Sequence, residues 1–239
     1  MTTNSRSHPK RQGASSHRLR WVDRAAIMTL VLLLLTAFTT PSAFASSLDQ
    51  GGRYNATFGS ATNNLISTAA EMNSASPSSG SCVIISILLA GATNQVETGL
   101  PRCNGISVDG TCPSGQIFVE TSYGSGFKCN PHGSFALGSY YSIGVARPAT
   151  GNWVGQVSHV NYAGIVGGWP SSVYSRTWGE WTSTGGHTCS GWGASGIFSG
   201  WTYRSNAGST QSFTNNNTTV AAGCWTVGTL NGGAYSVSH

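Results

Sequence analysis

From Ser46 to its end, the chain has no stretch that keeps the roughly 3.6-residue period of an amphipathic helix over three turns. Short runs rich in β-branched and aromatic residues recur instead, separated by glycine, serine and asparagine. Short strands at this spacing indicate an all-β protein, a sandwich or barrel of antiparallel sheets. We predict strands at residues 83–89, 116–120, 135–146, 153–160, 175–182, 196–203 and 220–229, with polar linkers at 74–81 and 206–217.

The N-terminal segment reads as a secretory signal. A basic stretch opens the chain, and an uncharged apolar run follows at residues 25–38. Pro41 and the Ala-Phe-Ala at 43–45 then form a cleavage site, which predicts a signal peptide over residues 1–45. An uncleaved membrane anchor is the alternative, and the proline and the Ala-x-Ala site disfavour it. We therefore expect a secreted protein with one β-sandwich domain at residues 46–239.

The charge balance excludes one class of partner. Six of the twelve lysine and arginine residues lie in the first 24 positions, whereas residues 46–239 carry six basic and six acidic side chains. A body without net charge lacks the basic surface that binds phosphate backbones, so we expect no nucleic-acid partner. No second apolar run is long enough to span a membrane, so we expect no membrane association after signal cleavage.

All six cysteines lie in the exported part, where an oxidising compartment favours disulfides. An even number predicts three bridges, whose connectivity the spacing leaves open. Cys103 and Cys112 are the strongest local pair, since a bridge between them would close a short glycine-containing loop. No Cys/His spacing typical of zinc is present, so we expect no metal and no cofactor. The cysteines are Cys82, Cys103, Cys112, Cys129, Cys189 and Cys224.

The inventory of catalytic side chains is short. The chain lacks the G-x-S-x-G, H-E-x-x-H and P-loop patterns, and nothing specific supports a Ser-His-Asp arrangement. Glu97 follows the most apolar predicted strand, and Glu180 lies between Trp178 and Trp181. A glutamate among aromatic rings is poorly solvated, which favours its protonated form. Two such carboxyls side by side titrate as a coupled pair that can activate water and protonate a carbonyl. Composition alone favours two ordinary strand-end or solvent-facing glutamates.

A series of short motifs in matching order resembles the neprosin family of secreted glutamic peptidases. The motifs are QVETG at 95–99, Cys103 with Cys112-Pro113, PATGNW at 148–153, VGGWPSSVY at 166–174 and WGE at 178–180. The first and last resemble the segments V/I-E-A-G-W and W-G-G-E, which carry the two catalytic glutamates of the family. The second resembles its small disulfide loop, and the other two resemble its P-x-x-G-N-W and V-G-Y-W-P-S-S-L-F segments. Together they span most of residues 82–230.

The resemblance implies a two-sheet antiparallel sandwich of jelly-roll type. It implies an endopeptidase that hydrolyses peptide bonds near proline, in polypeptides that include proline-rich ones, and that is favoured in acid. We expect the protein to be a monomer. Glu97 and Glu180 would be catalytic and share one proton, the ionised carboxyl taking a proton from water while the other donates one to the scissile carbonyl. Aromatic faces suit a proline ring, although core filling is the alternative role for such side chains. We expect Trp178, Trp181, Trp169 and Tyr174 to bind substrate, with His187 and Gln116 as polar contacts.

Departures from the family pattern bear on these expectations. One glycine in place of two precedes Glu180, which leaves the direction of its side chain open. Only residues 46–81 precede the first predicted core strand, which is short for the inhibitory propeptide of the plant enzymes. The last cysteine of the family has no counterpart, so the resemblance implies a Cys189–Cys224 bridge and leaves Cys82 and Cys129 for each other.

A binding module is the alternative function. Eight tryptophans, seven of them after residue 45, and a low charge suit a sandwich that stacks on carbohydrate or cell-wall polymers without catalysis. A glycosidase with the same two glutamates is a variant of this alternative, since paired carboxylates also hydrolyse glycosidic bonds.

Overall fold

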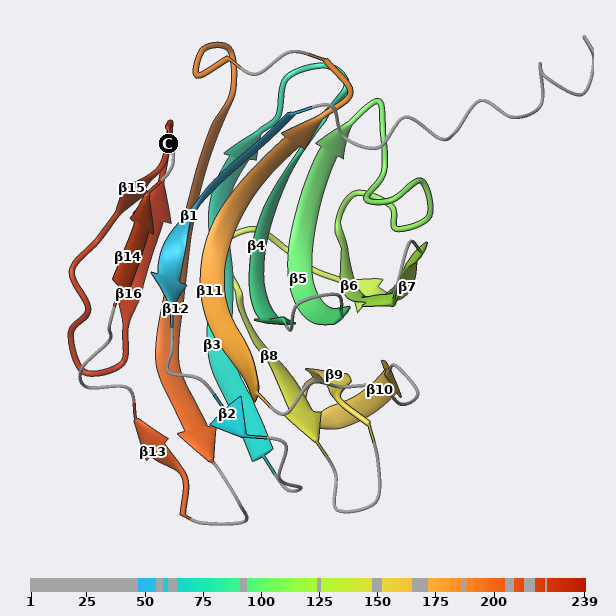
Figure 1. Ribbon diagram of the computed structural model, residues 1–239. Helices are drawn as coiled ribbons and strands as arrows, with labels where there is room; N and C mark the ends of the chain where they lie inside the picture. The colour runs from blue at the N-terminus through green and yellow to red at the C-terminus, as the bar shows by residue number, and fades with distance from the viewer. Residues whose placement is uncertain are drawn as a thin grey trace, which may run out of the picture. The chain divides into compact units, whose positions relative to one another are not determined.

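The computed structural model describes residues 47–54, 58–59, 64–90, 94–123, 126–147, 152–164, 172–185, 188–204, 209–212, 218–221 and 223–239. The regular structure in these ranges is entirely β-strand (Figure 1). Within them there is accordingly no helix long and apolar enough to cross a membrane. The predicted signal peptide over residues 1–45 lies outside the described residues.

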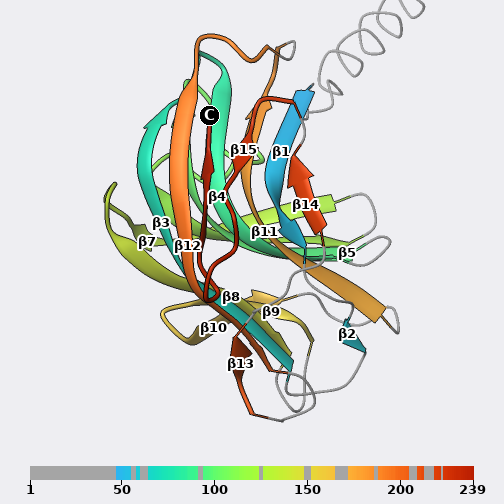
Figure 2. The same cartoon turned by 90° about the vertical axis from the view of Figure 1, so that its left-hand side faces the viewer.

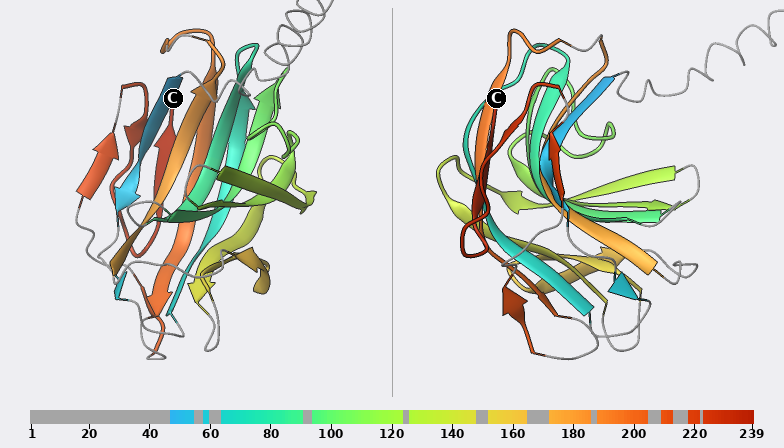
Figure 3. Two further views of the ribbon diagram at one scale, coloured as in Figure 1. Left: turned by 45° about the vertical axis from the view of Figure 1, so that its right-hand side comes forward. Right: turned by 60° about the vertical axis from the view of Figure 1, so that its left-hand side comes forward.

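Eight strands form the first sheet, in the order β14-β1-β11-β4-β5-β6-β7, with β2 paired to β11. Every pairing in it is antiparallel. The long strands β4, β5 and β11 curve along their length (Figures 1 and 3). The strands are β1 (Ser47–Tyr54), β2 (Phe58–Gly59), β4 (Ser81–Ala90), β5 (Asn94–Asn104), β6 (Gln116–Tyr123), β7 (Gly126–Ser134), β11 (Ser172–Ser183) and β14 (Thr218–Ala221).

The second sheet also has eight strands, in the order β10-β9-β8-β3-β12-β16-β15, with β13 paired to β12. Figure 2 shows β3 and β12 in one layer and β1 and β11 in the other. The prediction of an all-β, antiparallel, two-sheet sandwich is therefore confirmed. The strands are β3 (Asn64–Ser76), β8 (Tyr140–Arg147), β9 (Val154–Val157), β10 (Val160–Gly164), β12 (Gly193–Arg204), β13 (Gln211–Ser212), β15 (Thr226–Val227) and β16 (Tyr235–Ser238).

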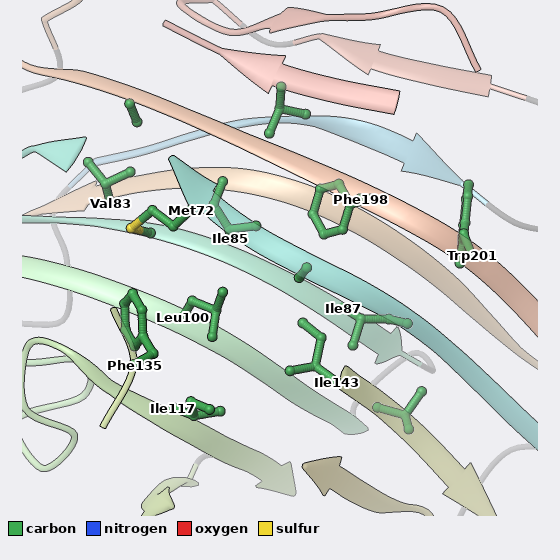
Figure 4. Close-up of a cluster of buried hydrophobic side chains, with 14 of the residues drawn as sticks. Met72, Val83, Ile85, Ile87, Leu100, Ile117, Phe135, Ile143, Phe198 and Trp201 are labelled. Carbon is green, nitrogen blue, oxygen red and sulfur yellow. The ribbon is translucent and has the colours of Figure 1, made fainter. Parts of the chain in front are cut away.

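One face of each sheet is buried in a shared core, because side chains alternate along a strand. Apolar residues from both sheets meet there (Figure 4). They include Val83, Ile85 and Ile87 of β4, Leu100 of β5, Met72 of β3, Ile143 of β8, and Phe198 and Trp201 of β12. The side chains of the first sheet that do not enter this core lie on its opposite, outer face.

The described residues before the first predicted strand form three strands, the two-residue β2 and the longer β1 and β3. β1 pairs with β11 in the first sheet, and β3 lies between β8 and β12 in the second. The described part of residues 46–81 thus belongs to the sandwich itself. The predicted linker at 74–81 is also partly wrong, since β3 continues to Ser76. Alanine and serine dominate the end of β3, so its strand state comes from its two neighbours rather than from propensity.

All six cysteines are paired, and the predicted connectivity is right for one bridge and wrong for two. A Cys103–Cys112 bridge does not form, because Cys103 is the cross-strand partner of Cys82 in the β4–β5 pair. Cys112 instead meets Cys129 of β7, so Cys82 and Cys129 do not pair with each other. The observed bridges are Cys82–Cys103, Cys112–Cys129 and the predicted Cys189–Cys224, with Cα–Cα distances of 4.0, 5.8 and 5.3 Å.

Candidate active site

Glu97 and Glu180 lie on the same face of the first sheet, away from the core. Glu97 stands in β5 between Val96 and Thr98, and both neighbours are directed into the sandwich: Val96 belongs to the core, and Thr98 Oγ1 donates to the Gly144 carbonyl of the second sheet at 2.9 Å. The alternation of side chains along a strand therefore directs Glu97 to the outer face. The sequence had suggested that Glu97 follows a strand; it lies within one.

A close approach between elements determines the direction of Glu180. A Cβ atom at Gly179 would lie 2.5 Å from the Trp225 ring, so glycine is needed where this ring packs against β11. Trp181, on the other side of Glu180, belongs to the core. Both neighbours of Glu180 thus face inward, and its carboxyl lies on the same face as that of Glu97. The single glycine of the WGE motif is sufficient for this arrangement.

The two glutamates flank the central strand β4. Glu97 is opposite Leu88 on one side of β4, and Glu180 is opposite Ile84 on the other. Ser86 lies midway between these positions, opposite Gly99 of β5 and Trp178 of β11. The carboxyls are therefore placed diagonally across Ser86, on strands that are far apart in the sequence.

Trp178 and Ser86 form the polar surroundings of Glu97, which is only 4% exposed. Trp178 Nε1 donates to Glu97 Oε1 at 3.3 Å and also to the Ser86 hydroxyl. Burial raises the pKa of Glu97 to about 7, while the hydrogen bonds from Ser86 and Trp178 and the charge of Arg176 partly offset this. A Cβ at Gly99 would lie 2.7 Å from the Cβ of Ser86, so a glycine is needed at this position to leave room for the serine.

Gln50 of β1 holds the second carboxyl. Its Nε2 donates to Glu180 Oε2 at 3.0 Å, and its Oε1 accepts from Arg176 Nη1 at 3.2 Å. Burial and then the negative charge of Glu97 raise the pKa of Glu180 well above its ordinary value, while Gln50 and Arg176 lower it. The charges of the two glutamates therefore influence each other, as two groups that titrate together do.

Sequence reasoning missed a third buried carboxyl, Glu120 of β6. It is the cross-strand partner of Glu97 and is 5% exposed, and its Oε1 accepts from Gln95 Nε2 at 3.0 Å. Burial, a hydrogen bond with Asp109 and the charge of Glu97 raise the pKa of Glu120 well above its ordinary value. One signal was available in the predicted strand at 116–120. Ile117 and Glu120 are an odd number of positions apart, so they lie on opposite faces, and an inward Ile117 directs the glutamate away from the core.

The predicted aromatic residues do not all lie beside the glutamates. Trp178 does, with the guanidinium carbon of Arg176 3.9 Å from its ring centroid. Trp181 lies in the core, where its ring stacks on that of Trp192 at a centroid distance of 5.6 Å. Trp169 and His187 lie outside the described residues, Tyr174 is placed in β11 by its backbone alone, and Gln116 is the first residue of β6.

Among the residues that the structure describes, no group of three or more histidine, cysteine, aspartate or glutamate side chains is arranged to hold a metal ion. The side chains gathered on this face suit proton transfer. They are carboxyls with raised pKa values, held by neutral donors from Trp178, Gln50 and Gln95.

Comparisons with known proteins support the fold. No protein-family model matches the chain, and no curated protein matches its sequence. Among solved structures, scytalido-glutamic peptidase with a transition state analog inhibitor superposes with a TM-score of 0.50 at 12% identity, over 79% of this chain and 97% of that chain. This chain therefore shares its fold with that solved structure. SCP-B, a member of the eqolisin family solved with the tripeptide Ala-Ile-His, has a TM-score of 0.48 at 12% identity, over 79% of this chain and 96% of that chain.

Replacing Trp178 by phenylalanine tests the hydrogen bonding around Glu97. Phenylalanine keeps a ring beneath Arg176 and loses only the N–H that donates to Glu97 and Ser86. The ionised carboxyl loses a donor, so the pKa of Glu97 should rise further, by about one unit at the low end for a hydrogen bond to a charged group. Carbon-13 NMR of labelled glutamate carboxyls measures this midpoint, and an unchanged or lowered midpoint would contradict the assignment.

Proposed function

We propose that this protein is a secreted endopeptidase that hydrolyses peptide bonds with Glu97 and Glu180 as a carboxyl pair. The observation that carries the proposal is the pair itself: two carboxyls with raised pKa values, on one face of one sheet, each held by a neutral donor. The fold adds support, because a solved structure that shares it is a peptidase with a transition state analog inhibitor.

The reaction requires one proton on the pair. The ionised carboxyl takes a proton from water, which then attacks the scissile carbonyl carbon. The protonated carboxyl donates to the carbonyl oxygen and, when the tetrahedral intermediate collapses, a proton passes to the leaving amine. Raised pKa values keep a proton on the pair from acid toward neutral pH, so the proposed enzyme works best in acid. The roles of acid and base belong to the pair as a whole.

The register suggests where the substrate lies. Between the glutamates, the row across the sheet contains Ser86 and Gly99, and the Phe118 ring packs against Gly99. We place the scissile bond on the outer side of this row, with one carboxyl at each diagonal. Trp178 borders this position, and a preference for proline, inferred from the resemblance to the neprosin family, would use aromatic side chains such as Trp178, Trp169 and Tyr174.

Secretion accords with the three disulfides, which form and persist in oxidising compartments. The alternative of a carbohydrate-binding module receives no support from the tryptophans. All six that the structure describes are buried, so their ring faces are not available for stacking on sugars. These are Trp153, Trp178, Trp181, Trp192, Trp201 and Trp225.

The test is cleavage by the full chain expressed with its N-terminal segment and collected from the culture medium. The secreted protein is incubated with proline-containing quenched peptides from acidic to neutral pH, and products are identified by mass spectrometry. A double variant, Glu97→Ala with Glu180→Ala, is the matched control. Cleavage by the parent protein and none by the control is expected. The absence of cleavage at every pH, together with binding to insoluble polysaccharides, would favour the binding module instead.

A further inference from the structure

Glu120 has no step in the proposed hydrolysis, yet it is buried directly beside the pair. It lies opposite Glu97 in the antiparallel β5–β6 register, where the Cβ atoms of such partners are about 5 Å apart. Two ionised carboxyls at this position, withdrawn from water, repel each other strongly. The acceptor Oε1 of Glu120 is already bonded to Gln95. This geometry favours a neutral acid at Glu120 while Glu97 is free to ionise.

The β5–β6 loop brings a further carboxyl, that of Asp109, into the neighbourhood of Glu120. Val108 and Cys112 of this loop pack with Phe118 and Cys129 on the outer face of the sheet, and the Cys112–Cys129 disulfide fixes the loop there. Asp109, between them, has a left-handed φ of 46° and an exposed side chain.

The carboxyl of Asp109 disfavours ionisation of Glu120 and so raises the pKa of that buried acid. Its effect has the same direction as the burial of Glu120 and the charge of Glu97.

The other charged groups around Glu120 do not favour its ionised form. Lys128 of β7 is opposite Thr121, so it lies on the other face of the sheet. The residue of β7 opposite Glu120 is Cys129, which is in a disulfide. Glu97 and Glu180 are both acids whose charges disfavour ionisation of Glu120. Arg176, across β4, instead acts on these two glutamates.

We propose that Glu120 is a positioning residue that must remain protonated for hydrolysis, because its neutral carboxyl, bonded to Gln95, places no second negative charge beside Glu97. The inference rests on the proposed peptidase function. Its consequence is that activity ends on the alkaline side through two ionisations: the loss of the last proton on the catalytic pair and the loss of the proton on Glu120.

The decisive variant is Glu120→Gln, because glutamine has the shape of the neutral acid, donates and accepts, and cannot ionise. On the alkaline limb, kcat/KM of the parent protein should fall about a hundredfold per pH unit, since two protons are lost. In the variant it should fall about tenfold per unit, with activity in acid near that of the parent. A merely structural role for Glu120 would leave the slope unchanged, and this result would overturn the proposal. Circular dichroism at each pH confirms that the rates belong to folded protein.

A second variant, Asp109→Asn, acts in the opposite direction. Asparagine adopts the left-handed conformation readily, so the loop keeps its turn, but the carboxyl that disfavours ionisation of Glu120 is lost. Glu120 then loses its proton at lower pH, and the alkaline limb moves down by a measurable fraction of a pH unit. Because Asp109 also acts on Glu97 and Glu180, the same substitution is made in the Glu120→Gln background, where its effect should be smaller. An equal shift in both backgrounds would overturn the role of Glu120.

Carbon-13 NMR of labelled glutamate carboxyls provides a readout that does not need activity. The signal that disappears in Glu120→Gln should titrate above the ordinary glutamate range of about 4.3 in the parent protein, and at lower pH in Asp109→Asn. Titration in the ordinary range would overturn the proposal. A protein that cleaves no peptide would overturn the proposed function and, with it, this role in hydrolysis. Cleavage with an unchanged alkaline slope would overturn the role of Glu120 alone.

Discussion

Replacing either Glu97 or Glu180 by glutamine is expected to lower kcat/KM for peptide hydrolysis by about 10²–10⁴-fold. Glutamine preserves the size of the side chain and can still bond to the donors that hold it, but it cannot take a proton from water. At the position of the acid, its amide can still donate a hydrogen bond to the carbonyl oxygen. The variant with the larger loss therefore identifies the general base. Steady-state kinetics with a quenched peptide at several acidic pH values measures both losses.

Glu71→Gln is the matched control for these variants. Glu71 is also a buried glutamate, but it lies on β3 in the second sheet. Its replacement should leave kcat/KM unchanged, because it makes the same chemical change away from the pair. Parent-like rates in both Glu97→Gln and Glu180→Gln would contradict a catalytic role for the two carboxyls.

The folded protein is expected to be most stable in acid and to lose stability as the pH rises. The pKa of Glu97 is raised from 4.5 to about 7, and those of Glu120 and Glu180 are also raised well above the ordinary value. The folded state therefore holds these protons more tightly than the unfolded state. The resulting stabilisation is fully present below about pH 4.5 and is lost as the pH rises through the pKa values of the folded state.

The expected size of this effect follows from Glu97 alone. A shift from 4.5 to about 7 corresponds to about 3 kcal/mol in the free energy of unfolding, fully lost above pH 7. For a domain of this size, the melting temperature should fall by about 10 °C between pH 4 and pH 8. Glu120 and Glu180 add to the loss in the same direction. Thermal unfolding followed by circular dichroism across this range measures the change.

Glu97→Gln should flatten this pH dependence, because one of the ionisations is removed and its repulsion on Glu120 and Glu180 disappears with it. A melting temperature that rises from pH 4 to pH 8 in the parent would show that these carboxyls are ionised at no cost in the folded protein. That result would contradict the burial on which the candidate site depends.

Several elements could be predicted because their local pattern is strong. The run of β-branched and apolar residues at 83–89 lies within β4, and that at 196–203 lies within β12. The whole of β5 was missed, since polar Gln95, Glu97 and Thr98 give it no continuous apolar pattern. Its strand state depends on its pairing with both β4 and β6, partners that no short window of sequence contains.

The candidate site was predictable only in part. Glu97 and Glu180 could be singled out because each lies in a short motif that resembles a catalytic segment of a known family. Gln50, Asp109 and Glu120 carry no comparable signal, and they reach the site through pairing and a disulfide-fixed loop. The same cause explains the disulfide errors, since proximity in sequence favoured Cys103 with Cys112, whereas strand register joins Cys103 to Cys82.

Local pattern decides the β class of this chain, because hydrophobic alternation and turn residues act over a few neighbouring positions. It also marks two glutamates as unusual. Long-range pairing decides which face each carboxyl occupies, which third carboxyl accompanies them and how far their protons are retained. These properties depend on register and burial: one step of register turns a side chain to the opposite face, and only the folded sheet removes water from Glu97, Glu120 and Glu180.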